Sequence, residues 1–211
     1  MRVVILTAST MIKKIEGKYF SGRCITGYDL DNNRIVRFVG NRDGAPMGPP
    51  KCNLFRPLEV VEISDITDCP ISCQTENVIG NYDKVLWKKS KYEPGIIDIY
   101  EKLQAMPRDD SSFMQNSGKK LLAVDSYKHS IELIKVEDLK VYSLSADGKN
   151  KIRCDFQFDG NQCKVYSVTD PNYAQLNDEL EIGNAYLAVS IPSDDYDGLG
   201  YYKFVAAIYP I

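Results

Sequence analysis

The feature that most constrains the fold of this chain is its succession of short β-type segments separated by turn residues. Each segment is rich in β-branched and other apolar residues, and Gly, Asp, Asn or Pro stands between many of them. Such segments predict strands, whose successive side chains face opposite sides of a sheet. The strands predicted in this way cover residues 2–7, 24–29, 34–39, 58–63, 121–124, 131–134, 139–142, 152–158, 163–168, 185–191 and 202–209.

Two short helices interrupt this pattern. The first starts at Pro94 and ends before Pro107, with an apolar stripe formed by Ile97 (or Ile96), Tyr100 and Leu103. The second starts at Pro171, directly after Asp170, a natural N-cap residue. Its apolar positions are Tyr173, Leu176 and Leu180. Residues 40–53 contain Gly and Pro without apolar periodicity, which predicts a long loop, and loops of this length are often functional.

The polar, serine-rich stretch 108–120 predicts a linker or flexible loop that divides the chain. Each half then holds about five strands, which suits a small OB-like barrel. Too few helices alternate with strands for a parallel α/β sheet, and too few strands are present for immunoglobulin-like sandwiches. We therefore predict a mainly β fold with a few short helices, built as two small OB-like β-barrels in tandem. The N-terminal barrel covers residues 1–107, with a helix near 95–105, and the C-terminal barrel covers residues 121–211.

The cysteines are predicted to be free thiols. Asp159-Gly160-Asn161 predicts a tight turn, whose loop is either Gly160-Asn161 or Asp159-Gly160. Cys154 and Cys163 are not directly opposed in either register, so they are expected to pack in the core. Only one close pair, Cys69 and Cys73, and a single histidine are present, so no metal site or cofactor is predicted.

Charge is distributed unevenly along the chain. The net charge is −3, yet residues 1–56 hold ten Lys or Arg against four Asp or Glu, a net of +6, and residues 57–211 carry a net of −9. A polyanion is therefore expected to bind the N-terminal third. No apolar run approaches the roughly 18 residues of a membrane span, and the run at residues 3–6 is too short for a signal peptide. We expect a cytoplasmic protein without a membrane partner.

Short motifs spread over almost the whole chain follow the pattern of one known family. They are Cys24–Asp29 followed by Arg34–Arg37, Gln74–Asn77, Tyr166–Pro171, Ala188–Ser190 and Tyr202–Ile208. In these motifs the chain resembles the dual OB-containing domain family, small prokaryotic proteins described as paired OB barrels. The resemblance implies recognition of nucleic acid or another ligand and no established activity.

Cations next to aromatic rings point to nucleic acid, because single-strand binders combine a basic groove with rings on which bases stack. We predict a recognition module that binds single-stranded or structured nucleic acid through the N-terminal barrel and the 40–53 loop. On the hairpin near residue 160, an alternation of period two predicts an outward face. The predicted binding residues are Lys13, Lys14, Tyr19, Arg23, Arg37, Arg42, Trp87 and Lys88, with Arg153, Lys164 and Tyr166 on this outward face.

Other functions stay open at this point. No nucleotide-binding or nucleophile-elbow motif is present, so an enzyme is not the favoured interpretation. His129 is interpreted as a surface histidine, and Asp170 as a helix cap. The alternatives are a protein-interaction or scaffold module with a protein partner, and an enzyme with a dispersed carboxylate pair in an interdomain groove.

Overall fold

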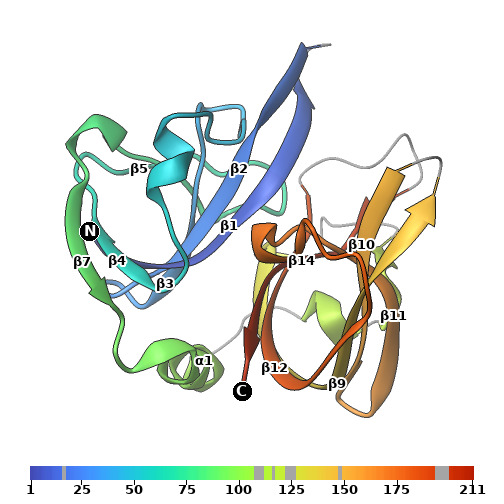
Figure 1. Cartoon of the computed structure of the whole chain (residues 1–211). Helices are drawn as coiled ribbons and strands as arrows, with labels where there is room; N and C mark the ends of the chain where they lie inside the picture. Colours follow the sequence, from blue (N-terminus) through green and yellow to red (C-terminus); the bar gives the residue numbers. More distant parts are fainter. Residues whose placement is uncertain (16–17, 107–111, 116, 122–126, 147–148, 193–199) are drawn as a thin grey trace. The chain divides into compact units, whose positions relative to one another are not determined.

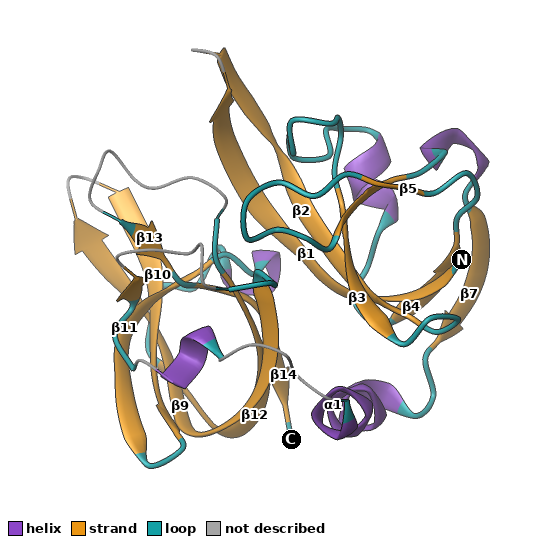
Figure 2. Ribbon diagram, turned by 180° about the vertical axis from the view of Figure 1, so that it is seen from behind, coloured by secondary structure: helices purple, strands orange, loops and turns teal. Residues whose placement is uncertain are grey.

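The computed structural model describes residues 1–15, 18–106, 112–115, 117–121, 127–146, 149–192 and 200–211, with only the backbone of residues 13–15, 18–19, 86–90, 146 and 149. The chain forms two compact units, unit 1 (Met1–Arg108) and unit 2 (Asp109–Ile211). Both consist mainly of strands (Figures 1 and 2). None of the helices in the described part of the chain is long and apolar enough to cross a membrane.

Unit 1 is built on one seven-stranded sheet with the strand order β5-β6-β3-β2-β1-β4-β7. Strands β1, β2 and β3 form an antiparallel meander, β4 pairs with β1, and β6 pairs in parallel with β3. The elements are β1 (Arg2–Ile15), β2 (Lys18–Asp29), β3 (Arg34–Phe38), the 3-10 helix η1 (Lys51–Leu54), β4 (Glu59–Glu62), β5 (Thr67–Asp68), β6 (Asn77–Ile79), η2 (Tyr82–Lys84), β7 (Leu86–Lys91) and the α-helix α1 (Gly95–Ala105).

The strands predicted for unit 1 are confirmed, and the first two are longer than predicted. β1 continues beyond Thr7 to Ile15, and β2 already begins at Lys18. The prediction ended early because polar residues and glycine obscure the alternation in this stretch. Side chains that face inward from β2 and β3 meet the loop residue Phe55 in the core, where the rings of Phe38 and Phe55 stack 5.8 Å apart.

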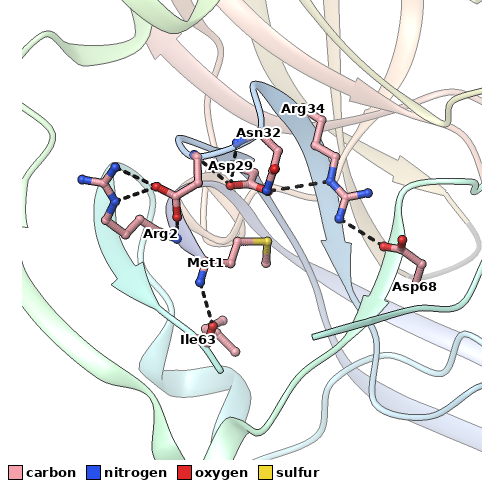
Figure 3. A network of polar contacts seen from close by, with 8 residues as sticks. Met1, Arg2, Asp29, Asn32, Arg34, Ile63 and Asp68 are labelled. Atoms are coloured by element: carbon pink, nitrogen blue, oxygen red, sulfur yellow. Dashed lines mark hydrogen bonds and ion pairs between the residues drawn. The ribbon is translucent and has the colours of Figure 1, made fainter. Parts of the chain in front are cut away.

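A polar network closes the turn between β2 and β3 (Figure 3). The buried carboxylate of Asp29 accepts a hydrogen bond from the backbone N–H of Asp31 at 3.0 Å, and Arg34 Nε lies 3.7 Å from it. Arg2 Nε donates to Asp31 at 2.8 Å, and Arg34 also pairs with Asp68 at 3.1 Å. Arg2 and Arg34 therefore have a structural role, because their ion pairs with carboxylates hold the turn against β1 and β5.

Unit 2 contains a closed five-stranded barrel with the order β10-β11-β14-β12-β9. Strands β9, β10 and β11 form an antiparallel meander, β12 pairs with β9, and β14 pairs in parallel with β11. The elements are η3 (Phe113–Gln115), β8 (Lys120–Leu121), β9 (Ile131–Ala146), β10 (Lys149–Phe158), β11 (Asn161–Val168), η4 (Pro171–Tyr173), β12 (Leu180–Ser190), β13 (Tyr201–Tyr202) and β14 (Phe204–Pro210). Residues 122–124 of the predicted strand 121–124 lie outside the described residues.

The two units share a three-stranded meander whose third strand pairs in parallel with a later strand, β6 in unit 1 and β14 in unit 2. The parallel ladder pairs Phe38 with Val78 in unit 1 and Val168 with Val205 in unit 2. Unit 1 adds β5 and β7 at the edges of its sheet. The predicted mainly β fold of tandem OB-like barrels is confirmed.

The predicted helices are only partly present. α1 covers Gly95–Ala105 and buries Ile96, Ile99 and Leu103, whereas Ile97 is 47% exposed, so the stripe that includes Ile97 was wrong. The helix predicted after Asp170 is a single 3-10 turn, Pro171–Tyr173. Leu180, the last residue of the predicted apolar positions, is instead the first residue of β12 and pairs with Val141.

Part of the predicted linker 108–120 packs into unit 2. Among its described residues, Phe113 and Met114 are buried in the turn η3. The ring of Phe113 contacts Tyr127 at 6.0 Å and His129 at 5.8 Å between centroids. The backbone N–H of Phe113 donates to the buried carboxylate of Glu132 at 2.7 Å. Two apolar side chains in a polar stretch therefore fix this segment to the barrel.

Candidate nucleic-acid interface

The hairpin of β1 and β2 extends past the rest of unit 1 as a two-stranded ribbon (Figure 1). Residues 9–15 of β1 pair with residues 18–24 of β2, whereas β4 pairs only with residues 2–4 and β3 only with residues 25–29. We call residues 9–24 the first ribbon. It holds four basic residues and one acidic residue, a net charge of +3. Ile12 is 68% and Phe20 is 37% exposed on it.

The loop at residues 40–47 is folded against this ribbon. Arg23 N donates to Met47 O at 2.9 Å, and Met47 N donates to Arg23 O at 3.0 Å. The side-chain oxygen of Asn41 accepts the N–H groups of Asp43 at 3.1 Å and of Ala45 at 2.9 Å. The exposed Arg42 lies between these anchored positions. The first half of the predicted long loop is thus an ordered element beside β2, and the second half contains η1.

Gly22 allows this close approach, and its substitution tests the docking of the loop. A Cβ atom at Gly22 would lie 2.3 Å from Met47 O, so Gly22→Ala is expected to displace the loop and to destabilise unit 1 by about 1–3 kcal/mol. Urea unfolding followed by the fluorescence of Trp87, the single tryptophan, measures the loss. Gly48→Ala is the control, because its Cβ would meet nothing within 4 Å. Equal stability of the two variants would contradict the docking.

Arg37 lies inside unit 1, next to a small pocket that residues of the docked loop also line. Its side chain is 4% exposed, and Nε lies 3.4 Å from Glu76 Oε1. Nη1 lies 2.7 Å from Cys24 Sγ. The group adjoins a pocket with room for about one water molecule. The pocket is lined by Met11, Cys24, Arg37, Phe38, Val39, Gly44, Ala45, Pro46 and Gln74. Contact between Arg37 and a phosphate would require exposing this buried side chain.

The thiols around Arg37 are poor nucleophiles. Burial raises the pKa of Cys24, although the positive charge of Arg37 opposes the shift. Burial and the negative charge of Glu76 raise the pKa of Cys73 to about 11. Because the thiolate is the reactive form, both side chains are protonated and unreactive at neutral pH. This cluster therefore supports structure or binding better than covalent chemistry.

The sequence offered no signal for the partner of Arg37. Glu76 follows Arg37 by 39 residues, and only the parallel pairing of β3 with β6 brings the two together. Five other predicted binding residues have side chains outside the described part of the chain: Lys13, Lys14, Tyr19, Trp87 and Lys88. Their backbone lies in the first ribbon and in β7.

The predicted outward face of the hairpin in unit 2 needs one correction. Its turn uses Asp159-Gly160 as the loop, because Phe158 pairs with Asn161. A bulge at Val165, which has a φ of 59°, shifts the alternation of β11. Tyr166 is therefore fully buried and not outward, and its ring lies 5.0 Å from that of Phe156. Lys164 is exposed and Arg153 is partly exposed.

Comparison with known families gives a match over nearly the whole sequence. A family model described as a dual OB-containing domain matches residues 1–208. The chain belongs to the dual OB-containing domain family. No curated protein matches it. Among solved structures, that of a murine DNA binding protein bound with ds DNA is 9% identical, with a TM-score of 0.35, over 100% of this chain and 98% of that chain.

The strands of this dual OB-containing domain can be assigned to their roles in OB barrels. Ligands of OB barrels bind to strands 2 and 3 and to the loops that follow strands 1 and 4. In unit 1 these parts include β2, β3 and the segment 63–76, whereas the connection from β1 to β2 lies outside the described residues. Of the predicted residues, Arg23 belongs to the first ribbon and Arg42 to the loop docked on it, whereas Arg37 lies within the fold.

Asp170 and His129, the other residues that the sequence analysis considered, have structural roles in this dual OB-containing domain. The N-cap role of Asp170 is confirmed, since its carboxylate accepts the N–H of Asn172 at 3.0 Å, and it also accepts that of Ile208 at 3.0 Å. His129 is only 24% exposed, and its Nε2 lies 3.2 Å from Glu132. All six cysteines are free thiols. Within the described ranges, no group of three or more His, Cys, Asp or Glu side chains could hold a metal ion.

Proposed function

We propose that the chain binds single-stranded or structured nucleic acid through the first ribbon and the docked 40–47 loop. The distribution of charge supports this proposal. Seven basic residues in 1–56 have described side chains, and four of them form ion pairs with carboxylates: Arg2, Arg34, Arg37 and Lys51. Within the described part of the chain, Arg23, Arg42 and Arg56 form no ion pair with a carboxylate. Arg23 and Arg42 both belong to the proposed surface.

The physical chemistry of the surface fits a polyanion with unstacked bases. Cations that replace the counterions of phosphate groups provide most of the sequence-independent affinity. The exposed ring of Phe20 adds a face for base stacking, which is worth about 1–3 kcal/mol per base. The net charge of −3 leaves the other surfaces of the chain without a general attraction for nucleic acid. Binding is therefore expected to require local basic surfaces such as this one and to depend strongly on salt.

Fluorescence anisotropy with labelled single-stranded and duplex oligonucleotides tests the proposal. Wild-type protein is expected to bind at low salt, with an affinity that falls linearly on a double-logarithmic plot against salt. Arg23→Ala combined with Arg42→Ala is expected to weaken binding to all sequences and to lower the slope by about two on duplex DNA, roughly one per lost phosphate contact.

The matched control is Arg56→Ala combined with Lys84→Ala. It removes the same charge from exposed positions of unit 1 outside the proposed surface. If the control weakens binding as much as the Arg23 and Arg42 variant, the attraction is nonspecific and the proposed surface is wrong. If wild-type protein binds no single strand and no duplex at low salt, the proposed function is wrong.

A further inference from the structure

Unit 2 carries a second ribbon at the equivalent place in its fold. β12 pairs with β9 only as far as Val141, and β11 pairs with β10 only from Arg153 onward. Beyond these limits Ser143–Ala146 pairs with Lys149–Ile152 as two strands alone (Figure 1). We call residues 142–153 the second ribbon. In both units the projecting element is therefore the hairpin of the first two strands of the meander.

The second ribbon carries a net positive charge, whereas the rest of unit 2 is acidic. Residues 109–211 hold ten basic and sixteen acidic residues, a net charge of −6. The second ribbon holds three basic residues against one acidic residue, a net charge of +2, so the rest of unit 2 carries −8. The first ribbon shows the same sign, +3, in a chain whose total is −3. Positive charge is thus concentrated on both projecting hairpins.

The described side chains of the second ribbon form an accessible basic face. Ile152 and Cys154 are buried, so Lys151 and Arg153 occupy the opposite face of β10. Arg153 Nη1 donates to the carbonyl oxygen of Ile152 at 3.0 Å. The nearby carboxylate of Asp155 accepts from the backbone N–H of Val165 at 2.7 Å, which ties this acid to the adjacent strand.

An exposed apolar side chain accompanies these cations. Leu144, which pairs with Lys151 across the second ribbon, is 43% exposed. The first ribbon likewise exposes Ile12 and Phe20. Each unit therefore presents a narrow two-stranded element that combines positive charge with exposed apolar surface.

We propose that the second ribbon is a further nucleic-acid-binding element, so that each unit contributes one ribbon to the binding of one polyanion. This inference rests on the proposed function and extends it to unit 2. Two binding elements joined in one chain make the second contact intramolecular, which raises affinity without any stronger single contact. The acidic remainder of unit 2 repels phosphates, so its contacts with nucleic acid are limited to the ribbon.

Charge removal from each ribbon in the full-length chain tests this inference by anisotropy with labelled duplex DNA. Lys149→Ala with Lys151→Ala and, separately, Lys13→Ala with Lys14→Ala are each expected to lower the salt slope by about two. The variant with all four substitutions is expected to lower it by about four and to lose more affinity than either pair.

The control is Lys119→Ala with Lys135→Ala, which removes two exposed cations of unit 2 outside the second ribbon. Thermal unfolding of every variant checks that the fold is retained. If the Lys149 and Lys151 variant binds like this control while the Lys13 and Lys14 variant is weakened, the second ribbon takes no part in binding and the proposed function stands. If wild-type protein does not bind, both proposals are wrong.

Discussion

Replacement of Glu76 by alanine is expected to lower the free energy of unfolding of unit 1 by about 3–5 kcal/mol. The Arg37 side chain is 4% exposed and the Glu76 side chain 6%, with 3.4 Å between Arg37 Nε and Glu76 Oε1. The variant leaves the guanidinium buried without this carboxylate. The cost of an uncompensated buried charge exceeds the modest net contribution of the pair itself. Urea unfolding followed by Trp87 fluorescence reports on unit 1.

Two further variants separate this effect from a general loss of contacts. Arg37→Met combined with Glu76→Leu removes both charges, and it is expected to regain most of the lost stability because no charge stays buried. Lys51→Ala breaks the exposed pair with Asp83, whose side chains are 42% and 77% exposed, and is expected to cost less than about 1 kcal/mol. A Glu76→Ala loss as small as that of Lys51→Ala would show that Arg37 readily reaches solvent.

The strands could be predicted because their alternation is visible in short windows of the sequence. The inward residues of β2 and β3 carry this signal clearly. Two kinds of feature could not be predicted. The extension of β1 to Ile15 depends on pairing with β2 and not on hydrophobicity. The burial of Tyr166 depends on one bulge at Val165, which reverses the face of every following residue in the strand.

The sequence was enough to predict that the candidate site is basic, but it was not enough to predict how its residues are arranged. The excess of positive charge in residues 1–56 is a property of the sequence. Some of these cations form ion pairs with carboxylates that are far away in the sequence, such as Arg34 with Asp68 and Arg37 with Glu76, and the sequence does not show these pairs. Of the basic residues of the second ribbon, Arg153 was predicted to bind, whereas Lys149 and Lys151 were not, because they stand in an acidic half of the chain. Only the pairing of β9 with β10 shows that they project from it.

The parallel strand pair of each unit also places a buried charge at an equivalent position. Glu76 directly precedes Asn77, which pairs with Arg37 in β3. Lys203 directly precedes Phe204, which pairs with Ser167 in β11. The negative charge of Glu76 is balanced by Arg37, whereas Lys203 carries the opposite charge, which the negative charge of Glu132 stabilises. Both units therefore depend on a compensating charge next to this ladder.

Replacement of Glu132 by alanine is accordingly expected to destabilise unit 2 by about 3–5 kcal/mol near neutral pH. The carboxylate is buried and accepts the N–H of Phe113 at 2.7 Å and the hydroxyl of Ser112 at 2.5 Å. Its removal leaves the buried Phe113 amide without this acceptor. It also leaves Lys203, 1% exposed, without the nearby carboxylate. Urea unfolding followed by circular dichroism, with the Trp87 transition marking unit 1, measures the loss.

The deficit of the Glu132→Ala variant, that is, its loss of unfolding free energy relative to the wild type, is expected to become smaller as the pH rises. In the wild type, burial lowers the pKa of Lys203 from 10.5 to about 8, although Cys163 and Glu132 act to raise it. Between these values the unfolded chain binds more protons at this residue than the folded chain does, so the contribution of Lys203 to stability rises with pH. Without Glu132 the pKa falls further, and the variant begins to regain stability at a lower pH.

Comparison of the two proteins at about pH 7 and about pH 9 follows this contribution, and a variant without Lys203 separates it from that of His129, whose Nε2 lies 3.2 Å from Glu132. Glu132→Gln, which keeps an acceptor for Phe113 N–H but removes the charge, is expected to show a smaller deficit with the same dependence on pH. Adding Lys203→Met to Glu132→Ala is expected to abolish that dependence, because the titrating amine is gone. A Glu132→Ala deficit that stays constant over this range would mean that the charge of Lys203 does not depend on Glu132.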